Sequence, residues 1–189
     1  MILGRLPGPR QAPLLWGSGI LSAGLLVWMN LGFATPFADL TGGRPMPDLD
    51  IETTGQSMLS LLSLLEGRTE AAELLRAMHF GPDLVLPASL GLSIVLLMRG
   101  LAPGAGLYGR PAERLLPMLL AVPIAYSVVD YAENVVSLLL FPPSSPAPGS
   151  ASLLAEALSW LTRVKFAALF IAGILVLRLA FGPKPASDG

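Results

Sequence analysis

Five polar residues that could carry chemistry stand in an apolar stretch in the second half of the chain. They are Tyr126, Asp130, Glu133, Asn134 and Ser137, at successive spacings of four, three, one and three. At about 100° per residue, a helix places these side chains within a stripe roughly 100° wide. Carboxylates in such a stripe can bind a proton, a cation or a polar headgroup, or can pair with a basic residue. The spacing therefore predicts one polar face, directed into a helical bundle.

Basic residues stand in the middle of the next apolar stretch. Arg163 and Lys165 lie there, and the helical period points them in nearly opposite directions. Asp83 opens an earlier apolar stretch. Counted at about 1.5 Å per residue from the arginine at the end of each helix, Asp83, Asp130 and Lys165 lie at similar heights of about 20 to 24 Å. The predicted intramembrane polar cluster consists of Asp83, Tyr126, Asp130, Glu133, Asn134, Arg163 and Lys165.

Two interpretations of this cluster remain open at the level of sequence. A charge in the hydrocarbon layer costs at least about 2.5 to 3.5 kcal/mol unless it is paired or hydrated. The carboxylates and the basic residues are therefore expected to compensate one another. One interpretation is a site for a proton, an ion or a polar headgroup. The other is an ion-pair network that fixes the register of the helices.

Several chemistries are excluded by what the sequence lacks. There is no cysteine, and His79 is the only histidine, so thiol chemistry and a Ser-His-Asp site find no support. The turn at 103–106 is glycine-rich but lacks the lysine of a phosphate-binding loop. The net charge of −1 offers no basic surface to nucleic acid. No catalytic residue, metal or cofactor is predicted, and nucleic acid is not an expected partner.

Composition requires a lipid-facing exterior. The chain of 189 residues is 53% hydrophobic and 13% charged, with a mean hydropathy of +0.66. A spanning helix needs about 20 mostly apolar residues, and four stretches meet or approach this length. They lie at about 13–34, 82–100, 115–141 and 151–181. The predicted fold is all-α, a four-helix transmembrane bundle within one membrane domain, 1–189. If the first stretch is a cleaved signal peptide, three helices remain.

The segment between the first two spans carries its own helical pattern. Within about 55–80, Met58, Leu61 and Leu65 share one helical face, and a second apolar stripe follows from Ala71 to Met78. We therefore predict an amphipathic helical hairpin on the outer mouth of the bundle or in the headgroup layer. The preceding residues, 36–54, are rich in proline, glycine and aspartate and are expected to form an irregular loop.

The distribution of basic residues predicts the orientation in the membrane. Short loops rich in arginine and lysine stay in the cytoplasm. Such residues are found in the N-terminal tail (Arg5, Arg10), in the connection around Arg110, and in the C-terminal tail (Arg178, Lys184). Both termini are therefore expected in the cytoplasm. The abundance of arginine over lysine, among many alanine, glycine, leucine and proline residues, favours a bacterial inner membrane.

A set of motifs resembles a family of uncharacterised bacterial four-helix integral membrane proteins. In order, they are Asp50 with Gly55-Gln56-Ser57, Asp83-Leu84-Val85-Leu86-Pro87, Asp130-x-x-Glu133-Asn134, and Thr162-x-x-Lys165-Phe166. Gln56 stands where an aromatic residue is expected, and Phe166 where tryptophan is usual. The resemblance covers about 50–166 and implies a shared bundle and polar level. It implies no activity.

Three functions compete. The first is a non-catalytic accessory or assembly protein of the membrane, whose charges hold the helices together. The second is a small proton- or ion-linked transporter that uses the polar face of Asp130 and Glu133. The third is an enzyme that modifies a lipid or isoprenoid, for which the sequence supplies no nucleophile or metal, so an enzyme is disfavoured. The expected partners are the lipid bilayer and either a second copy of the chain or another membrane subunit.

Overall fold

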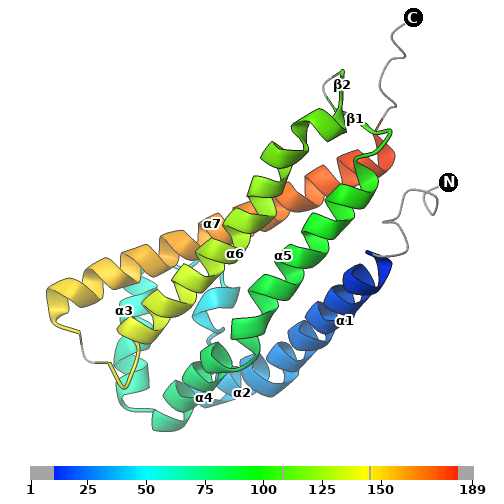
Figure 1. Ribbon diagram of the computed structural model, residues 1–189. Coiled ribbons are helices and arrows are strands. Elements are labelled where there is room, and N and C mark those ends of the chain that lie inside the picture. Colours follow the sequence, from blue (N-terminus) through cyan, green and yellow to red (C-terminus); the bar gives the residue numbers. More distant parts are fainter. Residues whose placement is uncertain (1–10, 108, 145, 183–189) are drawn as a thin grey trace, which may run out of the picture.

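The chain folds into a bundle of long helices with shorter helices gathered at one end (Figure 1). The computed structural model describes residues 11–107, 109–144 and 146–182. The long helices are α1 (Ala12–Met29), α5 (Pro82–Leu101), α6 (Ala112–Leu140) and α7 (Pro148–Phe181). The shorter elements are a π-helical turn (Asn30–Ala34), α2 (Thr35–Thr41), a 3-10 turn (Pro47–Leu49), α3 (Gly55–Glu66) and α4 (Thr69–Phe80). Strands β1 (Gly106–Leu107) and β2 (Arg110–Pro111) form a small antiparallel hairpin.

Four helical stretches are long and apolar enough to span a membrane. They are Ala12–Thr41, Thr69–Leu101, Ala112–Leu140 and Pro148–Phe181. The first two are longer than the apolar stretches in the sequence, because short helices continue them: α2 follows α1, and α4 leads into α5 with only Gly81 between them. The described residues therefore form an all-helical fold apart from the hairpin, in agreement with the predicted bundle.

A π-helical turn lets the first helix run past a proline. Pro36 has no backbone N–H to donate, and a proline inside an α-helix normally breaks it. Here the N–H of Thr35 reaches back to the carbonyl of Asn30, and the Thr35 hydroxyl donates to the same carbonyl. The wider turn accommodates Pro36, and the helix continues to Thr41, where Gly42 ends it in the left-handed conformation. Part of the segment expected to be irregular is thus helical.

Helices α3 and α4 occupy the segment between the first two spans. The hydroxyl of Thr54 accepts from the N–H of Ser57, and the Ser57 hydroxyl accepts from the N–H of Thr54, so a capping box starts α3. The apolar faces of both helices are buried against the bundle, with α3 packed on α7 and α4 on α5. These two helices, together with α2, cover the end of the bundle opposite the β1–β2 hairpin (Figure 1).

Small residues set the close packing of α1, α5 and α6. Ser22 of α1 donates to Ser89 of α5 at 2.9 Å, and Ser93 of α5 donates to Ser18 of α1 at 2.8 Å. On the other side of α5, a Cβ added at Gly91 would collide with the Ser127 hydroxyl of α6. Small side chains and hydroxyl pairs let helices approach closely where no hydrophobic effect drives them together.

Two apolar clusters form the core, one toward each end of the bundle. The cluster near the short helices includes Phe37, Met58 and Leu158, and the cluster near the hairpin includes Leu119 and Leu179. On α6 and α7, most of the buried residues between these clusters are polar. The charged side chains predicted from the sequence belong to this intervening layer.

Candidate functional site

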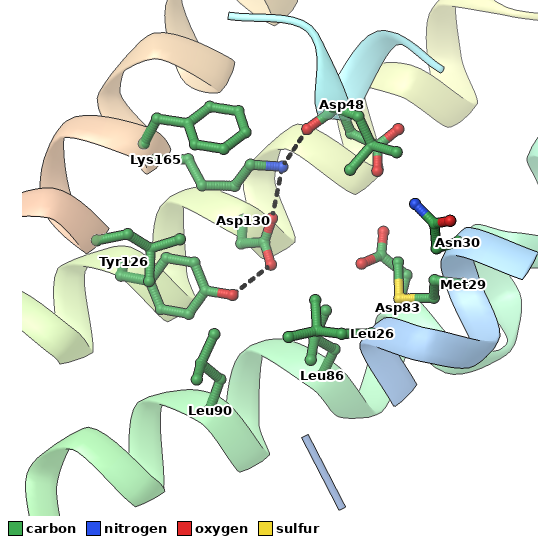
Figure 2. A pocket seen from close by; sticks show the side chains of 13 residues that line it. Leu26, Met29, Asn30, Asp48, Asp83, Leu86, Leu90, Tyr126, Asp130 and Lys165 are labelled. Atoms are coloured by element: carbon green, nitrogen blue, oxygen red, sulfur yellow. Dashed lines mark hydrogen bonds and ion pairs between the residues drawn. The ribbon is translucent and has the colours of Figure 1, made fainter. Parts of the chain in front are cut away.

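Lys165 is the centre of the polar layer. Its ammonium nitrogen lies 2.5 Å from Oε2 of Glu133 and 3.1 Å from Oδ1 of Asp130, both on α6. It also donates to the backbone carbonyl of Asp48 in the 3-10 turn, at 3.1 Å. Figure 2 shows this ammonium between Asp130 and the turn. The residue is buried, and two carboxylates and one backbone carbonyl of the protein lie around its ammonium nitrogen.

Glu133 belongs to the part of the layer that is buried between α6 and α7. Its side chain is completely buried and, besides Lys165, it accepts a 2.5 Å hydrogen bond from the hydroxyl of Thr162 on α7. Thr162 is itself buried and lies within reach of the Leu158 carbonyl one turn earlier. This half of the layer joins α6 to α7 through a charge-assisted contact and has the features of a structural ion pair.

A second group of polar side chains joins α4, α5 and α6. Nδ1 of His79 lies 3.0 Å from Oδ2 of Asp83, and its Nε2 lies 2.8 Å from the hydroxyl of Ser137. The Asn134 amide donates to the carbonyl of Asp83 at 3.3 Å. All four residues are buried. The start of α5 is therefore held against both α4 and α6 by polar contacts.

A cavity of about 300 Å³ opens beside these groups. Its lining residues come from α1, the π-helical turn, the 3-10 turn, α5, α6 and α7. They are Leu26, Met29, Asn30, Asp48, Leu49, Asp83, Leu86, Leu90, Tyr126, Asp130, Lys165, Phe166 and Leu169. Figure 2 shows the carboxylates of Asp48, Asp83 and Asp130 around one end of this space and leucine side chains at the other. The cavity is thus amphipathic.

Asp48 is the least satisfied member of this lining. The residue is 3% exposed, and its Oδ1 has no hydrogen-bond partner within the described part of the chain. Burial raises the pKa of Asp48, and the nearby Lys165 ammonium opposes that rise. A buried acceptor without a donor is costly. The side chain therefore has unused capacity to bind a hydrogen-bond donor or a cation.

Acidic groups outnumber basic groups in the buried layer. Among the described residues, four buried side chains are aspartate or glutamate, namely Asp48, Asp83, Asp130 and Glu133. Two buried side chains are basic, namely His79 and Lys165. With every group charged, four negative and two positive charges leave a balance of −2. An added cation would reduce this negative balance, whereas an added anion would increase it.

The structure brings six of the seven residues predicted for the cluster close together and places one elsewhere. Tyr126 donates to Oδ2 of Asp130 at 3.3 Å, which joins it to the Lys165 group. Arg163 lies on another face of α7, where it donates to the Thr53 carbonyl at 2.6 Å and its guanidinium lies 5.5 Å from the centre of the Trp160 ring. Arg163 thus anchors Thr53, two residues before α3, and is not part of the cavity lining.

Asp48 is the residue of this site that sequence reasoning missed. It belongs to the segment 36–54 that was expected to be an irregular loop. The only local signal is its position between apolar neighbours, Met46 and Leu49, in a short run with Pro47. Met46 is completely buried and draws the turn inward. Helical spacing could not reveal a residue that reaches the site from a loop.

No metal centre is evident in the ranges that the structure describes. Within them, no three side chains of histidine, aspartate or glutamate are arranged to hold a metal ion. The residues around the cavity can accept hydrogen bonds, hold a proton or bind a cation.

Comparisons of the chain with protein-family models, curated proteins and solved structures find no match in any of the three sets. The function is therefore inferred from the residues and geometry of the site.

Proposed function

We propose that this chain is a non-catalytic membrane protein that binds an amphiphilic ligand, with the polar head among the buried carboxylates and the apolar tail against the leucines. The observation that carries the proposal is the amphipathic cavity, with Asp48, Asp83 and Asp130 at one end and Leu86 and Leu90 at the other. Pockets that orient a ligand commonly combine apolar walls with a few convergent polar groups. A binding role of this kind suits an accessory protein.

The proposed setting is a bacterial inner membrane that the four long helices cross. Arg99, Arg110, Arg114 and Arg178 lie at or near the end of the bundle that carries the β1–β2 hairpin. The positive-inside rule favours a cytoplasmic position for that end. Arg5, Arg10 and Lys184, which support the same orientation, lie outside the described residues. Helices α2, α3 and α4 would then cover the outer mouth of the bundle.

The ligand would reach the cavity from the hydrocarbon layer. Leu26 and Met29 of α1 line one wall, and Phe166 and Leu169 of α7 line another. Among the described residues, α1 packs mainly along α5, whereas α7 packs along α6. Access between α1 and α7 would therefore separate no extensively packed pair of helices. A tail could stay in an apolar environment throughout this movement.

Catalysis is disfavoured because Lys165, the most basic buried group, is fully engaged. Its three donors contact Glu133, Asp130 and the Asp48 carbonyl, which leaves none for a substrate. It therefore positions the carboxylates and does not offer itself as a nucleophile. Tyr126 holds Asp130 from the other side.

A cavity-filling variant tests this function. Leu90→Trp fills the apolar end of the cavity, whereas Leu92→Trp places the same side chain on the exposed side of α5. The two variants are extracted in mild detergent, and bound amphiphiles are measured by native mass spectrometry and by chemical extraction. We expect a bound amphiphile in the wild-type protein and in Leu92→Trp, and its loss in Leu90→Trp. Equal amounts in folded Leu90→Trp and Leu92→Trp would contradict the proposal.

A proton-linked carrier is a second candidate, favoured by the contacts of His79 with Asp83 and Ser137 and by the cavity that Asp83 shares with Asp130. A carrier would move protons across the membrane, and a protein that only binds the amphiphile would not. In proteoliposomes that contain a pH-sensitive dye, Asp130→Asn would stop a proton flux while the protein still accumulates and folds. Absence of any ligand-dependent proton flux in the wild-type protein would leave amphiphile binding as the better account.

A further inference from the structure

We infer that the polar end of the cavity selects an amphiphile whose head is a protonated primary amine. This inference rests on the proposed function and deepens it, because it names the chemistry of the head. Three features support it: the excess of acceptors around the cavity, the buried Oδ1 of Asp48, which has no partner among the described residues, and the engagement of Lys165 by protein groups.

The polar groups that line the cavity are mainly hydrogen-bond acceptors. Carboxylates arrive from three separate elements: Asp48 from the 3-10 turn, Asp83 from α5 and Asp130 from α6. Lys165 is the only lysine or arginine in the described lining, and its donors are used within the protein. His79 lies behind Asp83 and contacts its Oδ2. An ammonium head would meet acceptors on several sides.

Asp48 gives the cavity a specific binding position. Its side chain is almost fully buried, its Oδ1 lacks a partner among the described residues, and the side chain lines the cavity with Asp83 and Asn30 beside it (Figure 2). The side-chain amide oxygen of Asn30 adds a further, neutral acceptor. A primary ammonium carries three N–H donors and no acceptor, so each donor can find an oxygen here.

Other heads fit this chemistry less well. A phosphate or carboxylate head would add negative charge and acceptors to a group of buried acids. A trimethylammonium head would bring the charge but no N–H donor for the carboxylates of the lining. An alcohol brings one donor and no charge. The order of affinity expected for one tail is therefore primary amine, then trimethylammonium, then alcohol, with the carboxylate weakest.

The size of the cavity favours a single apolar tail. At about 300 Å³ it lies at the lower end of the range for ligand pockets. Two sources could supply the same ammonium group: a free long-chain amine, or the headgroup of an aminophospholipid such as phosphatidylethanolamine. The phosphate of the latter would have to stay outside the carboxylate ring, so the free amine is the better fit.

The test uses the full chain in phosphatidylcholine nanodiscs. Dodecylamine, dodecyltrimethylammonium, dodecanol and dodecanoate are titrated, with empty nanodiscs as the blank for partitioning into lipid. We expect dodecylamine to bind at least about tenfold more tightly than dodecanol, since a hydrogen bond to a charged group is worth about 1.5 to 3 kcal/mol. Nanodiscs that contain phosphatidylethanolamine form a further arm. Competition by that lipid would identify the aminophospholipid as a source, and its absence the free amine.

Matched variants locate the effect. Asp48→Asn should reduce the preference for the amine to about threefold or less, because the amide keeps the shape but loses the charge. Asp39→Asn makes the same change on an exposed part of α2 and should leave the preference intact. The wild-type series is informative even if Asp48→Asn fails to fold, because the order of the four heads is measured without it.

The possible failures are distinguishable. Similar affinities for all four heads, each abolished by Leu90→Trp, would overturn the amine preference and leave the cavity as an amphiphile site. Two outcomes would overturn the proposed function itself. In the first, none of the four compounds binds more to protein-containing nanodiscs than to empty ones. In the second, binding is unchanged in Leu90→Trp. An amine preference retained in Asp48→Asn would overturn the role of Asp48.

Discussion

Nζ of Lys165 and Oε2 of Glu133 lie 2.5 Å apart, on facing surfaces of α7 and α6, with both side chains buried. Asp130, one helical turn before Glu133, contacts the same ammonium at 3.1 Å. Breaking a buried pair by removing one partner costs more than the pair contributes, because the remaining charge loses its compensation. The two helices are therefore coupled through one cation.

The first prediction is that Lys165→Met destabilises the protein by about 3 to 5 kcal/mol, because it leaves the two α6 carboxylates without their cation. The double variant Lys165→Met/Glu133→Gln should recover part of that loss. The measurement is the free energy of unfolding in mixed micelles as a function of denaturing detergent. Strictly additive losses from the two single changes would show that Lys165 and Glu133 are not coupled.

The second prediction concerns the contact of α5 with α6. Gly91→Val should reduce the free energy of unfolding by about 1 to 3 kcal/mol, since the added side chain meets Ser127 and the Pro123 carbonyl. Gly173→Val on α7 is the matched control, because nothing lies within 4 Å of a Cβ there. Both are measured by the same unfolding assay. Equal losses would mean that the intrinsic helix preference of valine, and not the α5–α6 contact, causes the effect.

The third prediction is that the stability of the folded protein depends on pH through the titration of Asp48. Burial raises the pKa of this carboxyl in the folded chain, with Lys165, His79 and Asp83 as the charged neighbours that also act on it. The folded state thus binds the proton more tightly than the unfolded state. Protonation of Asp48 therefore contributes to the stability of the folded chain. This contribution is fully present below the pKa that Asp48 has in the unfolded chain, and it is lost as pH rises through the pKa that Asp48 has in the folded chain. In ligand-free protein, the advantage of Asp48→Asn over the wild type should therefore grow as pH rises above the ordinary aspartate range.

Thermal midpoints of the two proteins between pH 4 and pH 8, a range of about four units chosen to extend above the ordinary aspartate pKa, measure this dependence. Asp39→Asn serves as the exposed control. A difference between Asp48→Asn and wild type that stays constant across the range would show that the Asp48 carboxyl does not titrate differently in the folded and unfolded states.

The fourth prediction is the orientation of the bundle. The chain has no cysteine, so single cysteines can be introduced without a background. Ser150→Cys at the start of α7 should react in intact cells with a thiol reagent that does not cross the inner membrane. Glu113→Cys at the start of α6 should react only after that membrane is permeabilised. Both side chains are exposed. The opposite pattern would reverse the proposed topology.

The long helices and the polar face of α6 could be predicted because both depend on local sequence. Hydropathy over about 20 residues identifies a span, and the 3.6-residue period decides which side chains share a face. Tyr126, Asp130 and Glu133 accordingly lie together in the structure. The same period separated Arg163 from Lys165 but could not decide which of them faces inward. That choice depends on Asp130 and Glu133, which lie on another helix.

The role of Asp48 could not be predicted because it depends on tertiary packing. The 3-10 turn reaches the site only when Met46 is buried and the Lys165 ammonium binds the Asp48 carbonyl. The extension of the first helix past Pro36 was also beyond local rules, since it requires a π-helical turn at Asn30. At both turns, the backbone conformation differs from the one that local sequence favours, and contacts with other elements of the fold stabilise it.

The buried partnership of Lys165 with α6 constrains how the protein is made. As α6 leaves the ribosome, it carries Asp130 and Glu133 toward the translocon without a cation, because Lys165 follows later in the chain. Two uncompensated carboxylates oppose the release of an isolated helix into lipid. The connection between the two helices, from Phe141 to Ala147, is short. We therefore expect α6 to remain in the translocon until α7 arrives, so that the two helices partition into the bilayer together, with Lys165 partly compensating the two carboxylates.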